Sequence, residues 1–162
     1  MSLPPSYSLS SVSPSPEAYN ALRLACGLDP FTLAAATLGL PNSLFTIVLL
    51  YHLPESSHSD TNDPPASEST PRKTSESEII GMGRVTGDGG CFYQVTDICV
   101  LPSHRGKGLA KVIMAEIEKW LKGNVPETGL VALLADGEAY RLYEQFGFRL
   151  SAPASLGMSR VF

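Results

Sequence analysis

The chain has 162 residues and is 43% hydrophobic, which suits a soluble globular protein with one hydrophobic core. Its formal net charge of −4 argues against nucleic acid as a partner, and no apolar run reaches the roughly 18 residues that a membrane span needs. The start of the chain has neither the basic segment nor the apolar stretch of a secretory signal, so we expect an intracellular, cytoplasmic protein. Reduced thiols, and no metal site, are the expectation for the scattered side chains of Cys26, Cys91, Cys99, His52, His58 and His104.

The first third of the chain predicts two strands and two helices. Alternating residues 7–12 predict a short strand. Ser15 is a suitable N-cap for a helix that opens with Pro16, and Gly27 ends it. A second helix is predicted over residues 30–38, and residues 43–53 are rich enough in Leu, Ile and Val for a long strand.

Residues 54–77 differ sharply in composition from the rest. They are nearly all Ser, Thr, Pro, Asp, Glu and Asn, without a large apolar residue. Such a segment buries too little apolar surface to offset its ordering entropy. We interpret it as a flexible insertion loop within a single domain that covers residues 1–162.

The second half predicts a mixed α/β domain with one central sheet. Together with residues 43–53, two further strands form an antiparallel meander, and a helix, a buried strand, a helix and two short strands follow. These elements are expected over residues 78–86, 91–101, 108–122, 130–135, 136–146, 148–150 and 158–162. The total is about six to seven strands, flanked by about four helices.

Two glycines mark the turn between the strand that ends at Leu101 and the next helix. Gly106 and Gly108 let the backbone approach a bulky anion, and the first N–H groups of the helix are free to bind it. Arg105, Lys107 and Lys111 add positive charge, with His104 nearby. These residues favour a pyrophosphate site, although a Gly-x-Gly turn alone also fits an ordinary helix entry with solvated basic side chains.

Two motifs resemble the GNAT superfamily of N-acetyltransferases. The residues Arg105-Gly106-Lys107-Gly108-Leu109-Ala110 match its Arg/Gln-x-x-Gly-x-Gly/Ala motif. The residues Leu142-Tyr143-Glu144-Gln145-Phe146-Gly147-Phe148 resemble its second signature and follow in the family's order. Residues 92–110, 133–148 and the Gly157-Met158 ending are also similar to plant-type serotonin N-acetyltransferases and their bacterial relatives.

The resemblance implies acetyl-CoA as acetyl donor. It also implies that the strand at residues 97–101 splays from the strand at residues 130–135 to admit the cofactor. Its pantetheine arm would pair with the backbone of Ile98, Cys99 and Val100. Its pyrophosphate would accept hydrogen bonds from the backbone of Arg105, Gly106, Lys107, Gly108, Leu109 and Ala110.

The resemblance also implies Tyr143 as the general acid that protonates the departing thiolate, since a phenol remains protonated at neutral pH. Tyr140, one turn earlier, is the alternative phenol and a further candidate for cofactor contact. Asp97 is a candidate base or amine anchor, and shares a strand face with Cys99. A structural carboxylate at Asp97, with a water chain as base, remains open. Cys99 fits a buried core residue better than an acetyl-cysteine intermediate.

The predicted function is transfer of the acetyl group to a primary amine by direct attack on the thioester. The acceptor is expected to be a small molecule of arylalkylamine or polyamine type. A protein lysine or N-terminal acetyltransferase and a catalytically weak acyl-CoA-binding module are the alternatives. We expect a monomer or homodimer that binds neither nucleic acid nor membrane.

Overall fold

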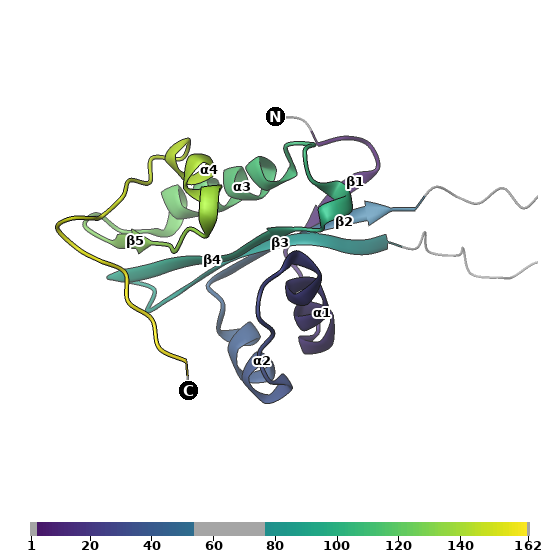
Figure 1. Cartoon of the computed structure of the whole chain (residues 1–162), viewed down its shortest axis with the longest axis horizontal. Helices are drawn as coiled ribbons and strands as arrows, with labels where there is room; N and C mark the ends of the chain where they lie inside the picture. Colours follow the sequence, from purple (N-terminus) through teal and green to yellow (C-terminus); the bar gives the residue numbers. More distant parts are fainter. Residues whose placement is uncertain (1–2, 54–76, 162) are drawn as a thin grey trace, which may run out of the picture.

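The computed structural model describes residues 3–53 and 77–161 (Figure 1). Strands and helices follow one another along the chain, joined in places by short 3-10 turns. The elements are β1 Tyr7–Ser10, α1 Pro16–Cys26, α2 Leu33–Gly39, η1 Leu40–Asn42, β2 Phe45–His52, β3 Ser77–Gly87, β4 Phe92–Val100, η2 Pro102–His104, α3 Leu109–Asn124, β5 Leu130–Ala132, η3 Gly137–Ala139 and α4 Tyr140–Glu144.

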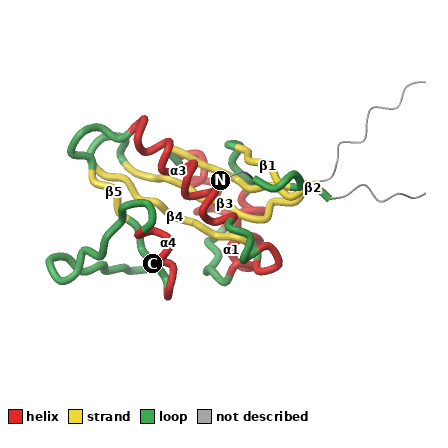
Figure 2. Tube along the Cα trace, turned by 90° about the horizontal axis from the view of Figure 1, so that it is seen from above, coloured by secondary structure: helices red, strands yellow, loops and turns green. Residues whose placement is uncertain are grey.

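One five-stranded sheet organises the described residues, with its strands in the order β1-β2-β3-β4-β5. The first four strands pair antiparallel, and β5 lies parallel to β4. Helices α1 and α2 cover one face of the sheet, and α3 and α4 cover the other (Figure 1). Figure 2 shows the same sheet from above, with α3 lying across it. The predicted mixed α/β fold, its antiparallel meander and its four helices are confirmed.

The prediction of six to seven strands is wrong for the described residues, where the sheet has five. Residues 148–150 and 158–161 are irregular rather than strands, and Leu150, Met158 and Val161 are largely exposed. Short apolar runs form strands only where they pair with a neighbouring strand, and neither of these runs is part of the described sheet. The predicted helix over 136–146 opens as a 3-10 turn, so that α4 spans only Tyr140–Glu144.

The predicted loop over residues 54–77 lies outside the described residues, apart from Ser77, the first residue of β3. Of the helices that are described, none has the length and apolar character needed to cross a membrane.

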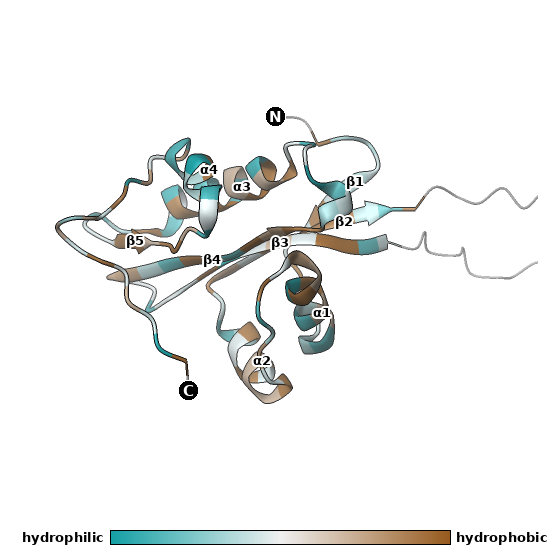
Figure 3. Cartoon of the chain, in the orientation of Figure 1, coloured by the Kyte–Doolittle hydropathy of each residue, from teal (hydrophilic) through white to brown (hydrophobic). Residues whose placement is uncertain are grey.

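Helix α3 packs closely on the sheet through an apolar stripe. Figure 3 shows apolar residues in brown along parts of α3 and of the strands beneath it. A Cβ atom at Gly83 of β3 would lie 2.6 to 2.8 Å from side-chain atoms of Ile98, Ile113 and Ile117. Gly83 therefore allows α3 to approach the sheet, and the Gly81-x-Gly83 pair serves packing. The buried residues of the stripe are Leu109, Ile113, Met114, Ile117 and Leu121.

A β-bulge at Asp97 reverses the faces of β4. Met82 pairs with Cys99 and Arg84 with Thr96, so one β3 residue opposes two on β4. Asp97 adopts a positive φ of 58° at this point. Before the bulge Tyr93 and Val95 belong to the core under α3; after it Asp97 and Cys99 face α1. The prediction that Asp97 and Cys99 share a face is confirmed.

The buried Asp97 carboxylate ties α1 to the sheet at the bulge. It forms an ion pair with Arg23 of α1 and accepts a 3.0 Å hydrogen bond from the Tyr19 hydroxyl. Asp97 also forms a second ion pair, with Arg84 of β3. The Arg84 Nε atom lies 3.2 Å from Asp97 Oδ2, but the two atoms do not have the geometry of a hydrogen bond. Burial, followed by the neighbouring Asp97 charge, raises the pKa of Tyr19 to about 12, so its hydroxyl remains a donor. Helix α1 and strands β3 and β4 thus meet at the Asp97 carboxylate.

Asp97→Asn should destabilise the protein by about 3 kcal/mol, because two buried guanidinium groups would lose their counter-charge. Asparagine tolerates a positive φ as aspartate does, so the substitution tests the charge rather than the backbone. Urea denaturation measures the change. The control is Glu118→Gln, which removes an exposed ion pair with Lys122 and should cost about 0.5 kcal/mol or less. Equal stability of the two variants would contradict a structural role for Asp97.

Candidate functional site

A cleft opens where β4 and β5 separate. Their pairing comprises only Phe92 with Leu130, Tyr93 with Val131 and Gln94 with Ala132. Beyond this point β4 continues to Val100 and lines a cleft of about 700 Å³. The end of α1 forms one wall, and the segment from Leu134 to Tyr143 forms the opposite one. The sheet is thus splayed at the position where the sequence predicts it.

The free edge of β4 supplies backbone hydrogen-bonding groups to the cleft. The Leu101 N–H donates to the Ile80 carbonyl at 2.8 Å, so Leu101 bonds towards β3. Alternation along an antiparallel ladder turns the N–H and C=O of Val100 the other way, towards the cleft. The Val100 carbonyl accepts a 3.0 Å hydrogen bond from Arg105 Nε. Ile98, Cys99 and Val100 all line the cleft, as predicted for a pantetheine site.

The glycine turn lies at the end of this edge. Gly106 and Gly108 adopt φ values of 78° and 75°, in the left-handed region that favours glycine. A Cβ atom at either position would meet nothing within 4 Å, so the backbone there is open to a ligand. Gly108 is the N-cap of α3 and offers no side-chain cap. The next N–H groups, of Leu109 and Ala110, therefore have no acceptor within the helix and suit an anion.

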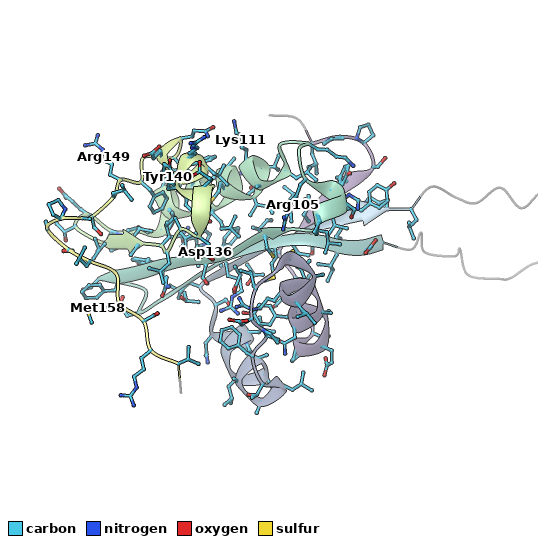
Figure 4. All side chains as sticks on the ribbon, in the orientation of Figure 1. Arg105, Lys111, Asp136, Tyr140, Arg149 and Met158 are labelled. Atoms are coloured by element: carbon cyan, nitrogen blue, oxygen red, sulfur yellow. The ribbon has the colours of Figure 1, made fainter. Side chains whose placement is uncertain are left out.

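The basic side chains of the turn are held by neighbouring elements. Arg105 lines the cleft and also donates to the Cys26 carbonyl at 3.2 Å, which joins α1 to the turn. Lys107 Nζ donates to the Tyr7 hydroxyl of β1 at 3.0 Å, and that hydroxyl lies 3.0 Å from His104 Nδ1. Figure 4 shows Arg105 beside the sheet and Lys111 on the outer side of α3.

Ala110 lines the cleft, whereas the Leu109 side chain is buried in the core, which leaves only its backbone for a ligand. The hydrogen bonds of His104 and Lys107 with Tyr7 of β1 hold the turn near the end of the cleft, with the backbone of its glycines exposed.

Tyr143 is the phenol that reaches the cleft. Its side chain is buried among core residues and lines the cleft beside Asp136. Burial raises the pKa of Tyr143, and the nearby Asp136 and Cys99 raise it further. The phenol therefore keeps its proton at neutral pH and is available as a donor.

Tyr140 lies apart from this group. It is not among the residues that line the cleft, and its hydroxyl accepts a 3.3 Å hydrogen bond from Arg141 Nε. In Figure 4 Asp136 lies nearer to the sheet than Tyr140 does. Of the two phenols on α4, the structure brings Tyr143 into the cleft.

Asp97 lies in the cleft wall, but its carboxylate is already engaged by two arginines and a tyrosine. This arrangement favours the structural interpretation of Asp97 over that of a base.

Sequence reasoning expected the first two helices to help build the acceptor site, but it singled out none of the α1 residues that form this wall of the cleft. Arg23, Cys26, Gly27 and Leu28 line it, although their helix was predicted correctly. The sequence contains one signal for this wall. Arg23 follows Tyr19 by four residues and so lies on the same face of the helix as that aromatic side chain, a position where a charged side chain usually has a partner. Across residues 3–53 and 77–161, no three His, Cys, Asp or Glu side chains are grouped to hold a metal ion.

Comparison with protein families matches residues 73–150 to the acetyltransferase (GNAT) domain. Among curated proteins, the chain is similar to two uncharacterized N-acetyltransferases called ycf52. It is 29% identical over 77 residues to that of Porphyra purpurea, covering 48% of this chain and 43% of the relative. It is 30% identical over 80 residues to that of Gracilaria tenuistipitata var. liui, covering 49% and 43%. The matched part is thus less than half the length of these relatives.

The solved structures that match nearly the whole chain include two bacterial proteins. One is SA2161 from meticillin-resistant Staphylococcus aureus, described as a protein of unknown function and a probable acetyltransferase. The chain is 36% identical to it with a TM-score of 0.77, and the match covers 96% of this chain and 99% of that one. The other is the GNAT-family acetyltransferase SP0256 from Streptococcus pneumoniae, at 20% identity and a TM-score of 0.64, covering 96% and 98%. This second likeness concerns the fold alone.

The splayed β4–β5 cleft, the glycine turn at its end and these similarities lead to one conclusion: the chain belongs to the GNAT family of acetyltransferases.

Proposed function

We propose that this protein transfers the acetyl group of acetyl-CoA to a primary amine, by direct attack of the amine on the thioester. One observation carries the proposal. The free edge of β4 and Tyr143 line one cleft, and so do Arg105 and Ala110, which flank the open glycine turn. Together they supply a surface for an extended thiol arm, a site for its pyrophosphate and an acid for its sulfur.

The residues of the turn fit the pyrophosphate of acetyl-CoA. Two phosphates need several donors at close range, and Gly106 and Gly108 leave the backbone open on that side. The N–H groups of residues 106–110 would bind them, with Arg105 and Lys107 adding positive charge. The N–H of Val100 would pair with an amide of the pantetheine arm, as an added strand does. Ile98 and Cys99 line the same stretch of β4.

The chemistry needs one acid and one proton acceptor. The amine nitrogen attacks the thioester carbonyl carbon, the C–S bond breaks, and the sulfur takes a proton from the Tyr143 hydroxyl. The attacking amine must first lose the extra proton of its ammonium form. Asp97 is engaged by Arg23 and Arg84, so we assign this second transfer to water in the cleft.

The acceptor is proposed to be a small primary amine. The likeness of residues 92–110 and 133–148 to plant-type serotonin N-acetyltransferases supports an arylalkylamine, and a polyamine is the other small amine expected. Release of CoA thiol from acetyl-CoA should be measured with matched panels of arylalkylamines, polyamines and lysine-containing peptides. Faster release with small amines supports the proposal. Turnover with peptides alone would point to a protein acetyltransferase, and CoA binding without any turnover would point to a binding module.

Gly108→Ala should weaken CoA binding by about tenfold, or roughly 1.4 kcal/mol, because its Cβ would occupy space that the pyrophosphate needs. Calorimetry with CoA measures the change. Gly89→Ala is the matched control, since Gly89 also has a positive φ and open space but lies in the β3–β4 hairpin. Both variants should lose similar stability from backbone strain. A folded Gly108→Ala protein with unchanged CoA affinity would show that the pyrophosphate binds elsewhere.

Tyr143→Phe should lower kcat by about 100- to 10,000-fold with little change in CoA affinity, because it removes only the proton donor. That loss corresponds to roughly 3 to 5 kcal/mol of transition-state stabilisation.

The pH dependence offers a second test of Tyr143. An acid acts only while protonated, and the raised pKa of Tyr143 delays loss of its proton to higher pH. The wild-type rate should therefore show no decline from this group between pH 7 and 9. Tyr140→Phe is the control and should retain nearly full activity. If Tyr143→Phe keeps more than about a third of kcat while chemistry limits the rate, Tyr143 is not the acid.

A further inference from the structure

Two cysteines that are far apart in the sequence meet in the wall of the cleft. Cys26 is the last residue of α1, and Cys99 lies on β4 just beyond the bulge. Both belong to the apolar cluster between α1 and the sheet, and both line the cleft. They lie close enough for each thiol to shift the pKa of the other. The bulge at Asp97 makes this contact possible, because it turns Cys99 towards α1.

The two thiols have unequal environments. Cys26 is half-buried and opens to the cleft, whereas Cys99 is buried. The hydrogen bond with Cys99, opposed by burial and aided by the Arg105 guanidinium, lowers the pKa of Cys26 to about 7. The same hydrogen bond, together with burial, raises the pKa of Cys99. At neutral pH a large fraction of Cys26 is therefore thiolate, while Cys99 keeps its proton and donates it to the pair.

An accessible thiolate beside a second thiol is the arrangement that forms a disulfide by exchange. Cys91 provides an internal contrast. It is exposed at the β3–β4 hairpin and belongs to neither the cluster nor the cleft. If exposure alone determined reactivity, Cys91 would be more reactive than Cys26. The position of Cys26 beside Cys99 therefore predicts a reactivity of Cys26 that exposure alone does not predict.

We propose that Cys26 and Cys99 form a redox-active dithiol in the cleft wall, which low-molecular-weight disulfides oxidise to an intramolecular disulfide. The Cys26 thiolate attacks one sulfur of the oxidant, forms a mixed disulfide and releases the first thiol. Cys99 then loses its proton, attacks the Cys26 sulfur and displaces the second thiol. The two cysteines lose two electrons and two protons in total, and the oxidant is reduced to two thiols. The dithiol shares the cleft with the proposed acetyl-transfer site, but its argument does not rest on that proposal.

The test uses the full chain with Cys91→Ser, so that the pair holds the only thiols. The protein is incubated at pH 7 with glutathione buffers of increasing oxidised fraction, quenched with acid, alkylated and analysed by mass spectrometry. We expect a product two hydrogens lighter, without glutathione, in which Cys26 and Cys99 resist alkylation together. Cys91→Ser with Cys99→Ser should instead retain one glutathione on Cys26, because the second thiol that displaces it is missing.

Three outcomes would overturn the proposal. One is accumulation of a glutathione adduct on Cys26 while Cys99 remains a free thiol in the Cys91→Ser protein. Another is full alkylation of both thiols after incubation with oxidised glutathione alone. The third is a disulfide between two chains rather than within one, which non-reducing electrophoresis reveals.

Discussion

A single buried carboxylate determines how the parts of this protein meet. Asp97 adopts a positive φ at a bulge in β4 and is held by Arg23 and Arg84. The ion pairs compensate a charge that would be costly to bury alone, and they join α1 to the middle of the sheet. Without the bulge, Asp97 and Cys99 would face α3, and α1 would lose its anchor. The cleft has an α1 wall because this interaction exists.

The cleft itself follows from how little β4 and β5 pair. Three residue pairs hold them together, and the remainder of β4 presents a free edge. That edge leads directly to the glycine turn, which β1 fixes in place through hydrogen bonds among Tyr7, His104 and Lys107. A strand from the start of the chain thus supports the turn at the far end of β4. The backbone at Gly106 and Gly108 remains open, because the side chains that support the turn bond to Tyr7 of β1.

Two titratable side chains of the cleft, Tyr143 and Asp97, lie in contrasting surroundings. Tyr143 is buried near Asp136, which keeps its proton in place and makes it a donor. The Asp97 carboxylate is instead already engaged by Arg23, Arg84 and Tyr19. This contrast is the basis for proposing Tyr143 as the acid and water as the proton acceptor. The proposed dithiol of Cys26 and Cys99 would add a second kind of chemistry to the same wall.

The sequence by itself determined what depends on near neighbours. The Ser15 cap and the Gly27 end of α1, the β3–β4 hairpin and the turn before α3 all follow from residues a few positions apart, and all lie where expected. The two short motifs also indicated the GNAT family, which the comparisons confirm.

Only the tertiary structure decided which side chains meet. The bulge turns Asp97 and Cys99 towards α1, where Asp97 meets Arg23, a residue far away in sequence, and strict alternation along a strand does not reveal it. The choice of Tyr143 over Tyr140 depends on how α4 lies against the cleft. The last two predicted strands fail for the same reason, because a strand needs a partner that its own residues do not encode.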